Sequence, residues 1–124
     1  LVDGNSDLAA IMKSMEPGVT GVSTAEREFQ DETFRNSGFG LYVTSKFFSE
    51  VGFFRILSGD SAVTVNSNGV SEHTWSFQGT CILMSCDLTK MDGAGERILK
   101  IIEEGEEASG GLIEASTASK RIGF

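Results

Sequence analysis

Several residue types are scarce in this sequence, and each scarcity argues against a class of protein. It has one histidine and two cysteines among 124 residues, with no Cys-x-x-Cys spacing, so a zinc site is not supported. Ten Lys and Arg stand against eighteen Asp and Glu, which gives a net charge of −8. So acidic a chain does not suit the extended phosphate surface of a nucleic acid. No apolar run approaches the length of a membrane span, so we expect neither nucleic acid nor a membrane as partner.

The two cysteines are predicted to be free thiols. Cys81 and Cys86 lie five positions apart in one expected strand, and the two-residue period of a strand sends their side chains to opposite faces. Their separation along an extended chain also exceeds the reach of a disulfide. Because free thiols are typical of a reducing compartment, we expect a cytoplasmic protein.

Three helices are expected from capping residues and apolar spacing. The first is capped by Asn5 or Ser6, the second begins past Gly40 and is closed by Gly52, and the third is capped by Asp92. The apolar residues that recur three or four positions apart in these segments are Leu8, Ile11, Met12, Met15, Val43, Phe47, Val51, Ile98, Ile101 and Ile102. Each helix therefore has one face suited to burial.

Four short strands are expected between the second and third helices. A turn at Ser58-Gly59-Asp60 separates the first two, and Asn68-Gly69 is a strong hairpin signal. The expected strands span about residues 53–57, 62–65, 71–77 and 80–86. We therefore predict an α+β fold, a two-layer sandwich in which an antiparallel or mixed sheet of about four strands is covered on one face by helices.

A glycine-rich turn at residues 36–41 is the most informative local pattern. Gly38 and Gly40 flank Phe39, and the second helix follows at once with Leu41. Such a turn brings backbone close to a ligand and points the first free N–H groups of a helix at an anion. The plainer interpretation is a helix entry with no ligand. The polar segment before it, residues 18–35, is either a mobile lid over a ligand or a disordered loop.

The order of these features resembles the C-terminal half of the GHKL ATPase domain, the Bergerat fold, and most closely its histidine-kinase-like branch. The resemblance covers about residues 5 to 88: a lid-like loop, Gly-x-Gly-Leu at a helix start, the helix, and strands ending in one that opens with Gly79-Thr80. It implies that Gly38, Phe39, Gly40 and Leu41 present N–H groups to the phosphates of ATP. It also implies that the Thr80 hydroxyl contacts adenine.

The resemblance further implies a division of the chain. Residues 1–90 would form a partial GHKL-type ATP-binding domain, with the lid at 18–35, the glycine turn at 36–41 and the strands at 53–88. Residues 91–124 would form a C-terminal helix and tail. Because the chain begins at Leu1 without Met, we expect a fragment of a longer protein.

The sequence also departs from the family pattern. The Asp-x-Gly-x-Gly box is not matched around Asp3, because Asn5 and Asp7 stand where glycines belong, so Asp3 receives no adenine role. The Mg-binding Asn and the general base are also missing, and the Mg ligands are expected outside this chain. Phosphoryl transfer depends on the metal and on positioning, so hydrolysis or phosphotransfer is expected only in the intact protein.

Two hypotheses of different classes follow. The first is a nucleotide-binding half of a GHKL-type protein that holds ATP and Mg. The second is a non-enzymatic α+β protein-interaction module. Under the first hypothesis the sheet would lack strands and would have an exposed edge that needs pairing. The expected partner for it is the missing N-terminal half or, in a homodimer, a second copy.

Overall fold

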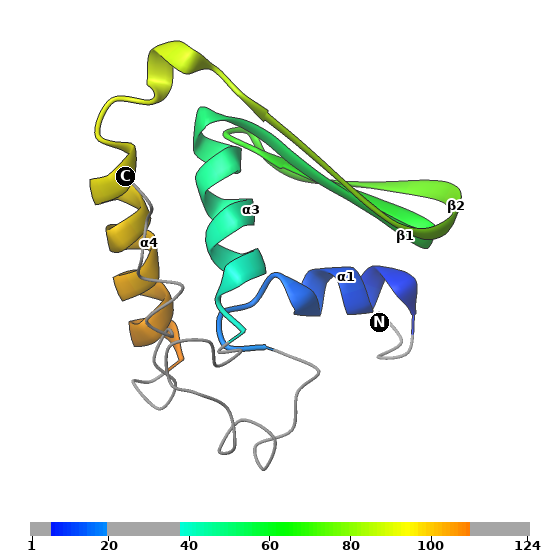
Figure 1. Cartoon of the computed structure of the whole chain (residues 1–124). Coiled ribbons are helices and arrows are strands. Elements are labelled where there is room, and N and C mark those ends of the chain that lie inside the picture. The colour runs from blue at the N-terminus through cyan, green and yellow to red at the C-terminus, as the bar shows by residue number, and fades with distance from the viewer. Residues whose placement is uncertain (1–5, 20–37, 110–124) are drawn as a thin grey trace.

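The computed structural model describes residues 6–19 and 38–109 (Figure 1). In chain order the elements are α1 (Asp7–Ser14), α3 (Gly40–Val51), β1 (Gly52–Asn66), β2 (Gly69–Cys86), the 3₁₀ helix η1 (Leu88–Lys90) and α4 (Ala94–Ala108). This confirms the α+β class. All three expected helices are present, and the second has the expected bounds, with Gly52 as its C-cap. The cap predicted for the third is wrong, because the N-cap residue of α4 is Gly93 and not Asp92.

The first helix begins as its sequence predicts. The Ser6 hydroxyl accepts a hydrogen bond from the Ala9 N–H at 3.1 Å and so satisfies one of the free donors of the first turn. Ile11 is the buried residue of this short helix. It packs against β1, and α1 thereby lies along one face of the hairpin (Figure 1).

The sheet differs from the prediction, because the described residues form two long strands and not four short ones. β1 and β2 pair antiparallel from Gly52↔Cys86 to Asn66↔Gly69, with register shifts around Gly59. The expected turn at 58–60 is therefore an irregularity within one strand. Glycine followed by a polar residue is compatible with either a turn or a β-bulge, and a bulge bends a strand without ending its pairing. The hairpin turn is confirmed, and there the Asn66 Oδ1 accepts from the Asn68 N–H at 2.9 Å.

The hairpin bends sharply on itself at this irregularity. Arg55 Nε donates to Thr64 Oγ1 at 2.8 Å, although both residues belong to β1. Nine residues of straight strand would span about 30 Å, so the two side chains meet only because β1 folds back between them. Figure 1 shows the bend near the start of α1.

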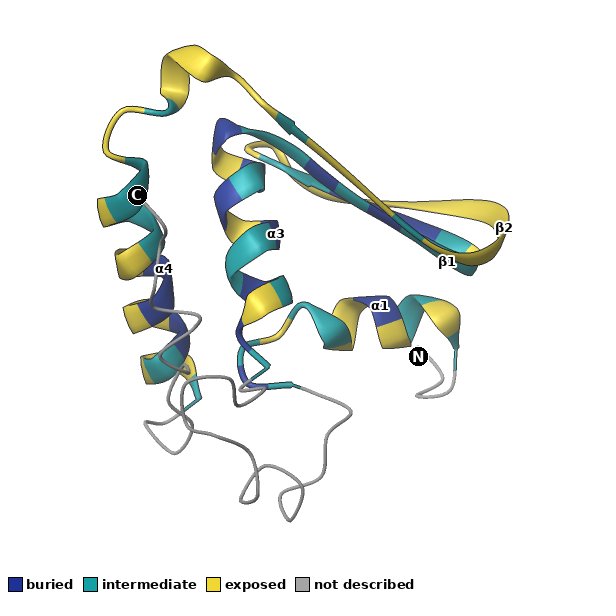
Figure 2. Cartoon of the chain, in the orientation of Figure 1, coloured by how far each residue is buried: buried dark blue, intermediate teal, exposed yellow. Residues whose placement is uncertain are grey.

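Burial is confined to one strand of the hairpin. Five residues of β1 are buried, whereas every residue of β2 is exposed or half-buried (Figure 2). One core cluster joins α1 to β1, with Leu41 and Phe48 of α3 at its margin. A second joins α3 to α4. Two helices, α1 and α3, therefore pack on one face of the sheet, mainly at β1, whereas α4 packs on α3.

Candidate functional site

The glycine turn leads into α3 at a helix end that has no side-chain cap. Phe39 is the N-cap residue, its side chain makes no capping hydrogen bond, and the first turn contains no acidic residue. The first N–H groups of a helix have no partners within the helix, and the helix dipole makes this end partly positive. Among the described residues, then, α3 presents an end suited to an anion.

The fold itself requires glycine at position 38. Its φ is +76°, in the left-handed region that side chains rarely adopt, and its carbonyl accepts from the Gly18 N–H at 3.2 Å. An added Cβ would lie 2.5 Å from the carbonyl carbon of Gly18 and 2.5 Å from the oxygen of Val19. The turn is thus pressed against the backbone that follows α1, and this contact explains the first glycine without any ligand.

The second glycine has no such explanation. Gly40 is exposed, its φ is outside the left-handed region, and a Cβ there would meet nothing within 4 Å. Gly40 is the first residue of α3, and neither its backbone conformation nor packing among the described residues gives a reason for glycine here. Among the described residues, the space beside Gly40 is open.

The two other predicted turn residues point their side chains into the protein. Phe39 is fully buried in the cluster between α3 and α4, and Leu41 packs at the margin of the cluster between α1 and β1. The Phe39 side chain is therefore not available to a ligand, and that of Leu41 is half-buried. What these residues can offer is their backbone N–H groups, which is the role that the resemblance implies for them.

Thr80 lies on β2 with its hydroxyl 3.1 Å from that of its cross-strand partner, Ser58. Ser58 follows Phe54 and Ile56 at the two-residue spacing of one strand face, and both of these are buried against the helices. The Thr80 side chain therefore points to the helix side of the sheet. It is nevertheless exposed, because the helices do not reach β2 there.

Two apolar residues extend this uncovered face. Ile82 and Met84 are the partners of Ile56 and Phe54, so they share the helix side with Thr80. They are 43% and 50% exposed, against 5% and 0% for their partners in β1. The helix side of β2 thus presents a hydroxyl beside two apolar side chains.

The turn and Thr80 lie near opposite ends of α1. The Asp7 carboxylate, at the start of α1, accepts from the Asp60 N–H at 3.0 Å and so marks the end near Thr80. The backbone beyond the other end of α1 contacts Gly38. A helix of eight residues is about 12 Å long, so a ligand touching both places would have to extend along α1.

Two further observations concern charge. Burial, and secondarily the Glu104 carboxylate, raises the pKa of Tyr42, which lies in the first turn of α3. Within residues 6–19 and 38–109, no group of three or more His, Cys, Asp and Glu side chains is placed to hold a metal ion.

The lid interpretation of residues 18–35 falls almost entirely outside the described residues.

No role was predicted from the sequence for Gly105 or for the apolar face of β2, although each has a sequence signal. Gly105 follows Ile98, Ile101 and Ile102 at the spacing of one helix face. Ile82 and Met84 follow Thr80 at the two-residue spacing of one strand face.

Comparison with protein-family models, with curated proteins and with solved structures finds no match for this chain. In the described part, no helix is long and apolar enough to cross a membrane. Cys81 and Cys86 are free thiols, as predicted.

Proposed function

We propose that this chain binds the phosphates of a nucleotide, with ATP as the expected one, at the start of α3. The observation that carries the proposal is the open space beside Gly40 at an uncapped helix end. Glycine at that position is unexplained by packing among the described residues, and it lets a phosphate approach the first N–H groups of α3 closely.

Thr80 and its apolar neighbours are the proposed contacts for the base. Ile82 and Met84 offer an apolar surface, and the Thr80 hydroxyl offers one polar contact that can orient a heterocycle. The distance along α1 favours a ligand with separate base and phosphate ends. This arrangement agrees with the resemblance to the GHKL ATPase domain, which remains part of the proposal.

Chemistry on the nucleotide is proposed only for the intact protein. The described residues offer no group of metal ligands, so Mg would be held by residues outside them. ATP would reach this acidic chain as its Mg complex, because the metal offsets part of the charge of the phosphates. A wider sheet of about four strands also belongs to the proposal, since added strands would pair with the free edge of β2.

Calorimetric titration of MgATP into the full-length protein tests this proposal. We expect binding, and we expect Gly40→Ala to weaken it severalfold without lowering the unfolding temperature, since the added Cβ occupies only the space proposed for phosphate. Glu50→Ala is the matched control, because Glu50 is an exposed residue of the last turn of α3, about 15 Å from Gly40. A protein that ignores MgATP, or a Gly40→Ala variant that binds it as well as the native protein, would overturn the proposal.

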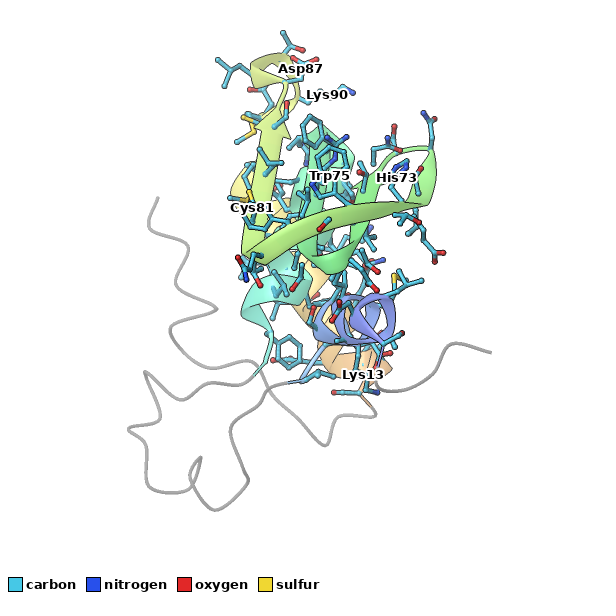
Figure 3. All side chains as sticks on the ribbon, turned by 90° about the vertical axis from the view of Figure 1, so that its right-hand side faces the viewer. Lys13, His73, Trp75, Cys81, Asp87 and Lys90 are labelled. Atoms are coloured by element: carbon cyan, nitrogen blue, oxygen red, sulfur yellow. The ribbon has the colours of Figure 1, made fainter. Side chains whose placement is uncertain are left out.

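The second candidate is a protein-interaction module without enzymatic activity, and the exposed apolar residues of β2 favour it. They are Val70, Trp75, Phe77, Ile82, Leu83 and Met84. Figure 3 labels Trp75 and Cys81 on the two halves of this strand. Of these, Ile82 and Met84 share one face of the strand, and exposed apolar side chains gathered on one face mark interaction sites. A protein that ignores MgATP but sediments as a dimer would favour this candidate, with a second copy as the partner.

A further inference from the structure

The residue between the two glycines is held by α4. The Phe39 side chain is fully buried in one cluster with Tyr42, Phe47 and Val51 of the α3 segment and with Ile101 and Ile102 of α4. Its ring meets the Tyr42 ring edge to face, at 6.2 Å between centroids. Phe39 is also the N-cap residue of α3, so contacts that hold its ring in place also hold the backbone at the start of the helix.

The rings of Phe39 and Tyr42 lie so close to the backbone of α4 at Gly105 that a larger residue would clash with them. A Cβ at Gly105 would lie 2.5 Å from Tyr42 Cε1 and 3.0 Å from Phe39 Cε1. Glycine is unfavourable in a helix, and Gly105 lies in the last turn of α4, before the C-cap residue Ser109. The close approach of two rings supplies the reason for it.

We infer that α4 is the positioning element of the glycine turn, and that Gly105 is its positioning residue. This inference rests on the proposed function. Displacing α4 would move the Phe39 ring, and with it the N–H groups proposed to receive phosphate, although α4 does not touch the ligand. Coupling between binding and docking is reciprocal, so a bound nucleotide would also stabilise the docking of α4.

Gly105→Ala tests the inference with two readouts. The first is the amide chemical shifts of Gly38 and Gly40, which report the geometry of the turn with no ligand present. The second is the Kd for MgATP, which we expect to rise roughly fivefold or more, the lower range of measured couplings. Glu103→Ala is the matched control, because Glu103 is exposed on α4, and it should change neither readout.

A second substitution should reverse the effect. Tyr42→Leu removes the ring atom nearest to the added Cβ, so Gly105→Ala combined with Tyr42→Leu should return the shift of Gly40 toward that of Tyr42→Leu alone. A merely destabilising effect of Gly105→Ala would not be reversed in this way.

The outcomes separate the inference from the proposed function. If the native protein ignores MgATP, the proposed function fails, and the amide shifts alone decide whether α4 sets the turn. If Gly105→Ala does not fold, Ile102→Val replaces it, since it loosens the same cluster by one methylene. Unchanged shifts at Gly38 and Gly40 in a folded Gly105→Ala protein, or in Ile102→Val, would overturn the inference.

Discussion

Replacing Gly38 by alanine should destabilise the fold strongly, whether or not a nucleotide is bound. The left-handed backbone at this position costs a non-glycine residue about 1–2 kcal/mol. The added Cβ would also press on backbone atoms of Gly18 and Val19 at 2.5 Å, and overpacking of this kind costs about 1–3 kcal/mol. Together the two effects give a loss of roughly 2–5 kcal/mol, a large part of the total stability of an ordinary domain.

Thermal unfolding followed by circular dichroism measures this loss. A domain of this size loses about 4 °C for each kcal/mol, so Gly38→Ala should unfold roughly 8–20 °C below the native protein. Gly40→Ala is the control, because its Cβ meets nothing and its φ is ordinary, and it should unfold at the native temperature or slightly above.

The comparison of the two variants decides whether the account of the turn is right. If Gly38→Ala unfolds at the native temperature, the turn does not press on the backbone after α1, and the first glycine would need another explanation. If both variants are destabilised equally, the space beside Gly40 is not open.

Two further predictions concern the helix junction and the bend in β1. Because burial and Glu104 raise the pKa of Tyr42, the only tyrosine, its tyrosinate absorbance should appear above the ordinary value of about 10. The stability that this raised pKa contributes is present below pH 10 and is lost as pH rises through the raised value. Glu104→Gln should lower the midpoint only in part, since burial is the larger cause, and an unchanged midpoint would exclude the charge of Glu104. Thr64→Val should cost about 1 kcal/mol in urea unfolding, because Arg55 Nε loses its acceptor, whereas Thr64→Ser should retain most of that stability; equal losses would contradict this account.

The helices could be predicted because their signals are local. The four-residue spacing of Val43, Phe47 and Val51 and the glycine after them fix α3, and the Ser6 hydroxyl marks the start of α1. Each of these signals acts within one or two turns of the chain, so no knowledge of the rest of the fold is needed to interpret them.

The strand number could not be predicted, because its signal is ambiguous without the partner strand. Ser58-Gly59-Asp60 has the composition of a tight turn, and only the pairing of Ser58 with Thr80 and of Ser61 with Thr74 shows that β1 continues through it. Whether a glycine reverses the chain or merely bends it depends on cross-strand contacts that lie far away in sequence. The exposed helix side of β2 escaped prediction for the same reason, since alternation gives the face of Ile82 but not whether a helix covers it.

The glycine turn shows most clearly what the sequence pattern leaves open. Gly38 and Gly40 look equivalent in Gly-x-Gly, yet only the first is required by a contact within the described fold. That contact is with the backbone after α1, and the ring between the glycines is fixed by α4, more than sixty residues further along the chain. The backbone contact at Gly38 and the packing of the Phe39 ring both involve the interior of the protein. Neither of them occupies the space beside Gly40. A glycine that the described part of the fold does not need, at a helix end that its N-cap residue Phe39 does not cap, is the feature on which the proposal of phosphate binding depends.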